Sequence, residues 1–261
     1  MNRLITRYGP WAIIAGASEG LGAAYARYLA KIGFNVILIA RREKNLNNLA
    51  EELETDYNIE TETKVLDLRN TDELADYIQG HPMDIGLAVY NAAYAPLAYF
   101  SDNSIEDLEM ITAVNVRSAL IFTKVIVDRY RSNKKSGGVV LMSSMAGNQG
   151  APRLASYAAS KSFNTILAEG LWHELKVDNI DVIASVAGAI RTPGYAKRSS
   201  TKEAPGTLDP EEVVVKTLQK LGKRPIVIPG RINAIGRFVM TRLLPKSLAI
   251  QMMHNNTKSL R

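Results

Sequence analysis

The sequence predicts a single-domain α/β protein with a doubly wound parallel sheet of about seven strands and helices on both faces. Short apolar runs alternate with longer segments of helical period, which is the pattern of a parallel sheet covered by helices. A chain of 261 residues with 46% hydrophobic residues can bury one large core. Neither an internal repeat nor a low-complexity tract divides residues 1–261, so we expect one domain.

The expected elements follow one another along the chain. The apolar runs expected as strands occupy 11–16, 35–40, 63–68, 85–93, 137–144, 180–188 and 224–230. The segments expected as helices cover 21–32, 43–56, 71–80, 104–130, 156–176 and 209–221. Such sheets bind ligands at the carboxyl ends of their strands, so the residues after each run are the first candidates for chemistry. Two long irregular stretches remain, 92–103 and 189–208, and we interpret the second as a mobile substrate lid.

Composition excludes several functional classes. The chain has no cysteine, which excludes disulfides, thiolate zinc sites and cysteine nucleophiles and agrees with a reducing cytoplasm. His81, His173 and His254 are scattered without ligand spacing, so we expect no metal site. The start of the chain lacks an apolar signal core, and no run of about eighteen apolar residues occurs. We therefore expect a soluble cytoplasmic protein.

The basic excess lies at the C-terminal end. The net charge is +6, yet residues 213–261 hold ten basic groups and no acid, leaving 22 basic against 26 acidic groups before them. A basic tail attracts anionic membranes, anionic substrates or nucleic acid, although a solvated basic face explains it equally well. No recognised nucleic-acid-binding module accompanies the charge, so we expect no nucleic-acid partner.

A glycine-rich loop follows the first expected strand and opens directly into a helix. It reads Gly16-Ala17-Ser18-Glu19-Gly20-Leu21-Gly22. Glycines allow a sharp turn and close approach of the backbone to a pyrophosphate, whose charge the helix N-terminus stabilises. Structural glycines in a tight turn look similar, but the place of this loop in the first β-α unit favours a Rossmann-type dinucleotide site. We expect Gly16, Ser18, Gly20, Leu21 and Gly22 to contact the cofactor.

The residues after the second and third strands predict the form of the cofactor. Ala40 stands where NAD enzymes commonly place an acid, and Arg41 and Arg42 follow it. Arginine grips a 2′-phosphate with paired, charge-assisted hydrogen bonds, so NADP(H) is favoured over NAD(H), with Arg41 the stronger candidate. Asp67 and Leu68 end the third strand, where a carboxylate can accept from the adenine amino group or, alternatively, cap the following helix.

A Tyr-x3-Lys pair places both side chains on one helix face, and the sequence contains two such pairs. Tyr130 with Lys134 lies at a polar helix exit before a strand. Tyr157 with Lys161 has Ser144 thirteen residues upstream, at the carboxyl end of an expected strand. Context therefore selects Tyr157 and Lys161 as the catalytic pair.

Five motifs in order resemble those of the short-chain dehydrogenase/reductase family, compact branch, over nearly the whole chain. They are GASEGLG at 16–22, NAA at 91–93, VNV at 114–116, SS at 143–144 and Tyr-x3-Lys at 157–161. The resemblance implies that Tyr157 transfers a proton, Ser144 orients the carbonyl, and Asn115 holds a water-linked proton path. It also implies that Lys161 binds the ribose and favours ionisation of the tyrosine, and that Asn91 lines the cofactor site.

Two motifs depart from the family pattern. The usual Asn-Asn-Ala-Gly reads Tyr-Asn-Ala-Ala at 90–93, and the usual Pro-Gly after the sixth strand reads Ala-Gly at 187–188. Alanine adds a methyl group and resists positive φ, so we expect a narrower or shifted wall beside the cofactor. The absence of proline frees the turn that, by resemblance, presents Ile190 and Thr192 to the carboxamide.

The cofactor half is most similar to 17β-hydroxysteroid dehydrogenases and very-long-chain 3-oxoacyl-CoA reductases, which says little about substrate. The expected pocket walls are rich in apolar side chains, namely Tyr94, Pro96, Leu97, Tyr99, Phe100, Met145, Pro152 and Leu154. We therefore expect an NADP(H)-dependent oxidoreductase that acts on a mainly apolar carbonyl or alcohol. The alternative is a catalytically weak NADP(H)-binding scaffold or sensor with peripheral membrane association.

Partner surfaces are predicted in two places. The helices near 104–130 and 156–176 carry apolar residues on more than one face, which favours a homodimer or homotetramer, as the resemblance also implies. The extension 231–261 combines basic and apolar residues in a helical pattern that Pro245 limits to about three turns. Weak contact with an anionic membrane is one interpretation; packing on the body or in an oligomer is the one we favour.

Overall fold

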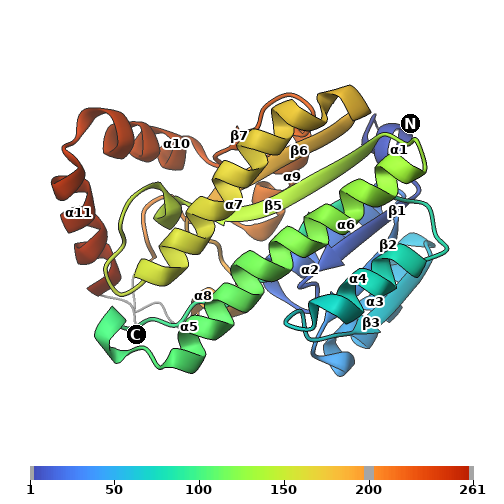
Figure 1. Ribbon diagram of the computed structural model, residues 1–261, viewed down its shortest axis with the longest axis horizontal. Helices are drawn as coiled ribbons and strands as arrows, with labels where there is room; N and C mark the ends of the chain where they lie inside the picture. The colour runs from blue at the N-terminus through green and yellow to red at the C-terminus, as the bar shows by residue number, and fades with distance from the viewer. Residues whose placement is uncertain (1–2, 197–202, 259–261) are drawn as a thin grey trace.

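A seven-stranded parallel sheet forms the centre of the molecule (Figure 1). The computed structural model describes residues 3–196 and 203–258. The strand order is β3-β2-β1-β4-β5-β6-β7, and every described pair of neighbours is parallel. The strands are β1 (Trp11–Ala15), β2 (Asn35–Ala40), β3 (Thr61–Val65), β4 (Ile85–Tyr90), β5 (Gly137–Ser144), β6 (Ile180–Ala187) and β7 (Ile226–Val227). The predicted fold class and strand number are confirmed.

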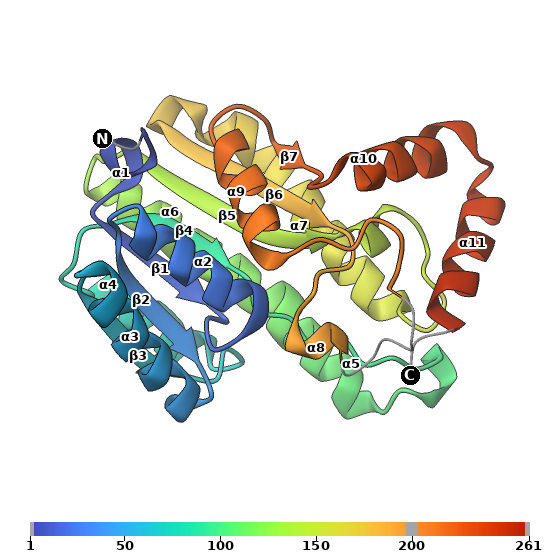
Figure 2. The same ribbon diagram turned by 180° about the vertical axis from the view of Figure 1, so that it is seen from behind.

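Helices cover both faces of the sheet, as Figures 1 and 2 show from opposite sides. One face packs against α2 (Gly20–Lys31), α3 (Glu43–Tyr57) and α9 (Pro210–Lys220). The other packs against α4 (Thr71–Gly80), α6 (Ser118–Ser132) and α7 (Ala155–Glu174). Because β1, β2 and β4 are buried on both faces, their sequences are continuous apolar runs instead of alternating ones. Shorter helices are α1 (Arg3–Tyr8), α5 (Ile105–Ile111) and α8 (Pro193–Ala196).

The order of the strands creates a switch point beside β1. The chain runs from β1 outward through β2 to β3 and then crosses back to β4 on the other side of β1. Ligands of open α/β sheets bind in the crevice at this point. Gly16 follows β1 there, and the backbone N–H groups of Asn91 and Ala92, after β4, donate to the carbonyl oxygen of Ala15 over 2.9 and 3.0 Å.

The helical run Ile105–Ser132 contains α5, a π-helical turn at Thr112–Arg117 and α6. By length and composition this run could cross a membrane, but half of its most apolar stretch of 18 residues is buried inside the protein. Its side chains Ala119, Phe122 and Ile126 belong to the core beneath the sheet. We therefore interpret the run as a core helix.

The C-terminal segment forms an angled arm that leads away from β7 (Figure 2). It consists of α10 (Arg231–Phe238), a π-helical turn Val239–Leu243 and α11 (Lys246–Lys258). The first helical stretch ends just before Pro245, as expected. Ile232, Ile235 and Phe238 are 63%, 64% and 58% exposed. Packing on the body therefore leaves these three residues of the apolar stripe largely uncovered, and the other part of the favoured interpretation, an oligomer contact, stays a prediction. Residues 259–261 of the extension lie outside the described residues.

Candidate active site

A cavity of about 670 Å³ opens where the carboxyl ends of the strands meet, and its size is typical of small-molecule and cofactor sites. Most of the residues expected to bind the cofactor line it: Gly16, Ser18, Gly20, Leu21, Arg41, Arg42, Asp67, Leu68, Asn91, Tyr157, Ile190 and Thr192. Four further expected site residues are not among those that line it, namely Gly22, Asn115, Ser144 and Lys161. The sequence analysis did not assign Glu19, Met110, Val114 and Gly188 to the site, and they also line the cavity. Three residues of the expected lid line it as well, namely Ala189, Gly194 and Tyr195.

The glycine-rich loop requires glycine at positions 16, 20 and 22. Gly16 has a φ of +86°, and a Cβ there would lie 2.7 Å from the backbone nitrogen of Ala92. Gly20 has a φ of +58°, and a Cβ on Gly22 would lie 2.0 Å from the carbonyl oxygen of Gly16. Side chains at these positions would strain the loop or fill it. The loop therefore leaves its backbone accessible at the start of α2, as a pyrophosphate requires.

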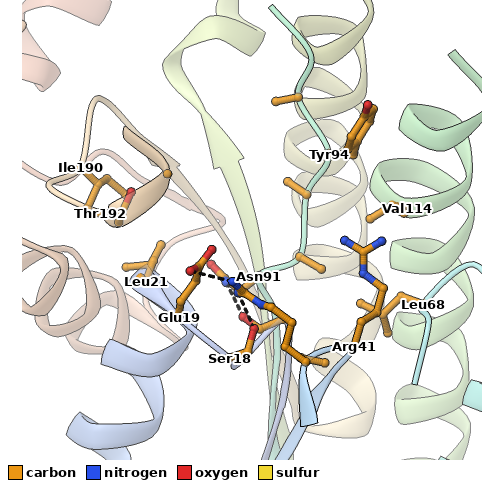
Figure 3. A pocket seen from close by; sticks show the side chains of 18 of the residues that line it. Ser18, Glu19, Leu21, Arg41, Leu68, Asn91, Tyr94, Val114, Ile190 and Thr192 are labelled. Carbon is orange, nitrogen blue, oxygen red and sulfur yellow. Dashed lines mark hydrogen bonds and ion pairs between the residues drawn. The ribbon is translucent and has the colours of Figure 1, made fainter. Parts of the chain in front are cut away.

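The two arginines after β2 have different neighbours, and Figure 3 labels the first of them, Arg41. Arg41 lies on the side of Leu68 and Val114. Arg42 turns toward the glycine loop, where its Nη1 donates to Oε2 of Glu19 over 2.8 Å and its Nη2 donates to Oγ of Ser18 over 2.7 Å. Both arginines line the same cavity, so two cations are present where a 2′-phosphate is expected.

Asp67 lines the cavity but is already engaged by Arg69. Its Oδ1 accepts from the Arg69 backbone N–H over 3.0 Å, and its Oδ2 accepts from the Arg69 guanidinium over 2.7 Å. The Arg69 side chain holds the pKa of the Asp67 carboxyl below its ordinary value, more strongly than burial raises it. The alternative role of Asp67 as a helix cap is wrong, because Asn70 caps α4 by accepting from the Glu73 backbone N–H.

The motif Tyr-Asn-Ala-Ala at 90–93, which departs from the family pattern, forms part of the cavity wall, and none of its residues has a positive φ. Asn91 Nδ2 donates to the carbonyl oxygen of Gly16 over 2.9 Å and so joins β4 to the glycine loop. Tyr90 turns away into the core, where its hydroxyl donates to the carbonyl oxygen of Val114 over 2.6 Å. Ala92 and Ala93 line the cavity, and neither is among the described non-glycine residues with positive φ. Ala93 therefore contributes its methyl group to the wall without straining the chain, and the expected narrowing stays a prediction.

Helix α7 carries Tyr157 and Lys161 and is fastened to β5 by two buried hydrogen bonds. Lys161 Nζ donates to the carbonyl oxygen of Met142 over 2.9 Å, and Ser143 Oγ donates to the carbonyl oxygen of Lys161 over 2.7 Å. The Lys161 nitrogen lies 5.6 Å from the centre of the Tyr157 ring. Lys161 is 2% exposed, and this burial lowers its pKa to about 8. Ser143, whose role the sequence did not reveal, thus positions the helix.

Asn115 lies in the π-helical turn and is fully buried. Its Oδ1 accepts from the backbone N–H of Tyr94, and its Nδ2 donates to the Tyr94 carbonyl oxygen over 2.8 Å and to Ser160 Oγ over 3.0 Å. Ser160 Oγ in turn donates to the carbonyl oxygen of Tyr157 over 2.7 Å. The amide of Asn115 therefore joins the cavity wall to the helix that carries Tyr157, which is a positioning role; the water-linked path stays a prediction.

Ser144 ends β5 and begins a tight turn against α7. Its Oγ accepts from the backbone N–H of Ala146 over 3.2 Å. A Cβ on Gly147 would lie 2.7 Å from the backbone nitrogen of Ser162, so only glycine allows this turn to approach α7. Glycine at 147 therefore lets the turn that follows Ser144 approach α7 at Lys161 and Ser162.

The second Tyr-x3-Lys pair lies elsewhere in the fold. Tyr130 is 1% exposed, and its hydroxyl donates to the carbonyl oxygen of Gly138 over 3.3 Å, at the amino end of β5. Lys134 is exposed in the following turn. Tyr130 and Ser144 therefore lie at opposite ends of β5, and the choice of Tyr157 as the acid/base stays a prediction.

The segment after β6 folds over the cavity without the family's proline. Ile190 pairs with Leu208 in an isolated bridge, and Arg191 forms ion pairs with Glu203 and Asp209 across the base of the expected lid. A Cβ on Gly188 would lie 2.9 Å from the side chain of Asn233 in α10. These contacts join the turn after β6 to the far end of the expected lid and to α10. Residues 197–202 of the lid lie outside the described residues.

Comparison with known proteins identifies the family. A model of the short chain dehydrogenase family matches residues 10–203. A 7beta-hydroxysteroid dehydrogenase from Mediterraneibacter gnavus is 32% identical over 239 residues, covering 87% of this chain and 88% of the relative. A very-long-chain 3-oxoacyl-CoA reductase from Danio rerio is 32% identical over 260 residues, covering 95% and 78%.

Solved structures agree over the whole fold. A 7beta-hydroxysteroid dehydrogenase structure has a TM-score of 0.88 at 28% identity and covers 97% of this chain and 99% of its own. A short-chain dehydrogenase from Sphingobium yanoikuyae in complex with NADPH has a TM-score of 0.77 at 27% identity, covering 85% and 88%. With its parallel sheet, glycine loop and Tyr-x3-Lys helix, the chain belongs to the short-chain dehydrogenase family of oxidoreductases.

Proposed function

We propose that this protein is an NADP(H)-dependent enzyme that interconverts a mainly apolar ketone and its secondary alcohol. The observation that carries the proposal is one cavity lined both by Arg41 and Arg42 and by Tyr157. The candidate phosphate-binding arginines and the candidate acid/base therefore face the same cavity. Hydride transfer requires this arrangement, because the dinucleotide and the carbonyl must be bound next to each other.

The residues fit a bound dinucleotide. The glycine loop holds open a cradle that a Cβ would fill, at the positive end of α2. Arg41 and Arg42 supply charge-assisted donors for a 2′-phosphate, whereas Ala40 supplies no acid to repel one. The similarity to a short-chain dehydrogenase in complex with NADPH supports the same choice. When bound, the nicotinamide supplies or accepts the hydride.

The chain's own groups manage the proton. The Tyr157 hydroxyl donates a proton to the carbonyl oxygen in reduction and takes it back in oxidation. Lys161, when charged, favours the tyrosinate that remains. Ser144 orients the carbonyl by hydrogen bonding to its oxygen. Asn115 and Ser143 hold these groups in register through α7.

The walls near Tyr157 favour an apolar substrate. Tyr157 packs in one cluster with Leu154, from the turn before α7, and Met253, from α11. Met110 and Val114 line the cavity itself. Apolar walls with a few convergent polar groups are typical of sites for apolar ligands. The similarity to hydroxysteroid dehydrogenases and 3-oxoacyl-CoA reductases supports bulky alicyclic or long-chain ketones as candidates.

A carbonyl panel tests this function. The purified protein is assayed with steroid ketones, with 3-oxoacyl thioesters and with small polar ketones as controls, each with NADPH and with NADH. We expect turnover of apolar ketones with NADPH. Binding of NADPH without turnover on any class would contradict the enzyme proposal and support the alternative of a cofactor-binding scaffold.

Peripheral membrane contact is a second candidate property, carried by the arm. Its exposed apolar residues Ile232, Ile235 and Phe238 are accompanied by exposed Arg231 and Arg242. A helix that presents both kinds of residue gains from apolar insertion and from attraction to anionic lipid. An oligomer contact through the same residues is the competing explanation.

A further inference from the structure

Glu19 stands at an unusual place for an acid. It is the residue before Gly20 in the phosphate cradle and the N-cap of α2, yet its side chain makes no capping hydrogen bond. Its carboxylate instead accepts a hydrogen bond from Arg42 Nη1 over 2.8 Å (Figure 3). This acid therefore engages one of the two cations available for a 2′-phosphate.

The contact is a bridge across the mouth of the cavity. Arg42 follows β2, whereas Glu19 and Ser18 follow β1, and the same guanidinium reaches both. The side chains of Arg42 and Glu19 are 47% and 41% exposed, and both residues line the cavity. Exposed pairs of this kind are weak and exchange partners readily. The bridge can thus open when a stronger anion arrives.

We propose that Glu19 is a specificity-determining residue that lowers the affinity of the enzyme for the 2′-phosphate. It does so in two ways: it holds Arg42 while the phosphate is absent, and it places a negative charge beside the phosphate when it is present. A 2′-hydroxyl neither needs Arg42 nor meets this repulsion. Glu19 therefore narrows the preference between NADP(H) and NAD(H). This inference rests on the proposed use of NADP(H).

Binding of cofactor fragments to the whole protein tests the proposal without turnover. The probes are adenosine 2′,5′-bisphosphate, which carries the 2′-phosphate, and adenosine 5′-monophosphate, which lacks it; calorimetry at low salt gives the dissociation constants. Glu19→Gln should tighten binding of the bisphosphate about three- to tenfold, since it frees Arg42 and removes the repulsion. Binding of the monophosphate should stay within about twofold of wild type.

Glu52→Gln is the matched control. Glu52 is 36% exposed and forms a similar ion pair with Arg27, but neither residue lines the cavity. The control makes the same change of net charge, so it should leave both dissociation constants unchanged. Equal tightening by Glu52→Gln would assign the effect to net charge and overturn the proposal. Unchanged or weaker bisphosphate binding by Glu19→Gln would overturn it as well.

Failure of the cofactor assignment gives a different result. A wild-type protein that binds the monophosphate more tightly than the bisphosphate would contradict the proposed preference for NADP(H). If Glu19→Gln still tightened bisphosphate binding in that protein, the role of Glu19 would stand. If the wild type binds the bisphosphate more tightly and Glu19→Gln binds it with the same dissociation constant, only the proposed role of Glu19 is contradicted.

Discussion

Lys161 Nζ donates a hydrogen bond to the carbonyl oxygen of Met142 over 2.9 Å, two residues before Ser144 ends strand β5. The lysine is 2% exposed, and this carbonyl oxygen also accepts from Asn164 Nδ2 over 3.3 Å. The proposed function requires Lys161 to be charged beside Tyr157, whereas burial makes the charged form of its side chain unfavourable. Activity and stability oppose each other at this position.

Lys161→Met should stabilise the protein at pH 7 while lowering kcat at least about a hundredfold, the scale of an acid/base contribution. Burial lowers the folded-state pKa of Lys161 from 10.5 to about 8, so keeping it charged costs on the order of 3 kcal/mol. Loss of its hydrogen bond offsets about 1 kcal/mol, because Met142 keeps Asn164 as a donor. We therefore expect a net gain of about 1–3 kcal/mol in the free energy of unfolding, measured by denaturant titration.

The difference between the folded and unfolded pKa of Lys161 also makes the free energy of unfolding depend on pH. Between pH 8 and 10.5 the unfolded chain binds more protons at Lys161 than the folded chain. The contribution of Lys161 to the free energy of unfolding therefore rises with pH across this window and is constant below it. Lys161→Met should lack this rise. A variant less stable than wild type at pH 7, or with an unchanged pH slope, would contradict the assignment.

Tyr157→Phe should lower kcat at least about a hundredfold and leave binding of NADPH unchanged, because only the transferable proton is lost. Tyr130→Phe is the matched control. Its hydroxyl contacts the Gly138 carbonyl oxygen in the core, so its removal should cost about 1 kcal/mol of stability and no activity. Steady-state kinetics and thermal melts separate the two effects. Wild-type turnover by Tyr157→Phe would reject Tyr157 as the acid.

Arg41→Ala should narrow the preference for NADPH over NADH by about ten- to a hundredfold in affinity, since one charge-assisted phosphate contact is lost. Arg41 lines the cavity beside Leu68. Arg27→Ala, which removes a cation paired with Glu52 away from the cavity, serves as the control. The ratio of KM values for the two cofactors is the measurement. Equal use of NADH and NADPH by the wild type would refute our interpretation of Ala40 and Arg41.

The fold was predictable because its physical causes are local. Continuous apolar runs indicate strands buried on both faces, and each predicted run contains or overlaps a strand of the sheet. The placement of the two candidate reacting groups was predictable for a related reason: spacing within one helix fixes the position of Tyr157 relative to Lys161.

Contacts between distant segments were not predictable from the sequence. Nothing local indicates that Ser143 donates to the carbonyl oxygen of Lys161 or that Arg42 pairs with Glu19. The role of Asn70 as the cap of α4 was open to a local argument, since Glu73 follows it by three residues. Exposure of the apolar stripe on α10 depends on where the arm leaves β7, which helical periodicity does not determine.

The protein should be a dimer or tetramer in solution. Leu120 on α6 and Ile166 on α7 are 42% and 63% exposed, as expected for helices with an apolar outer face. Ile166→Asp should reduce the mass measured by light scattering, because a charge in an apolar contact between copies is costly. Val177→Asp, at a residue 85% exposed, is the control. A wild type that is strictly monomeric at micromolar concentration would reject the prediction.

The arm should bind vesicles rich in phosphatidylserine at low salt and ignore neutral vesicles. Each basic residue near such a surface contributes about 1 kcal/mol, and the apolar residues beside it add insertion. Ile232, Ile235 and Phe238 are exposed, so replacing all three with serine should abolish co-sedimentation and leave the thermal midpoint unchanged.

Deleting the whole arm would be a less specific experiment. Thr257 Oγ1 donates to the carbonyl oxygen of Pro152, and Arg153 donates to the carbonyl oxygen of Thr257 over 2.8 Å, so α11 supports the loop before Tyr157. The triple serine variant leaves those contacts in place. If it changes the mass measured by light scattering while wild-type protein ignores anionic vesicles, the stripe is an oligomer contact and the membrane proposal fails. Loss of vesicle binding at constant mass would instead support the membrane proposal.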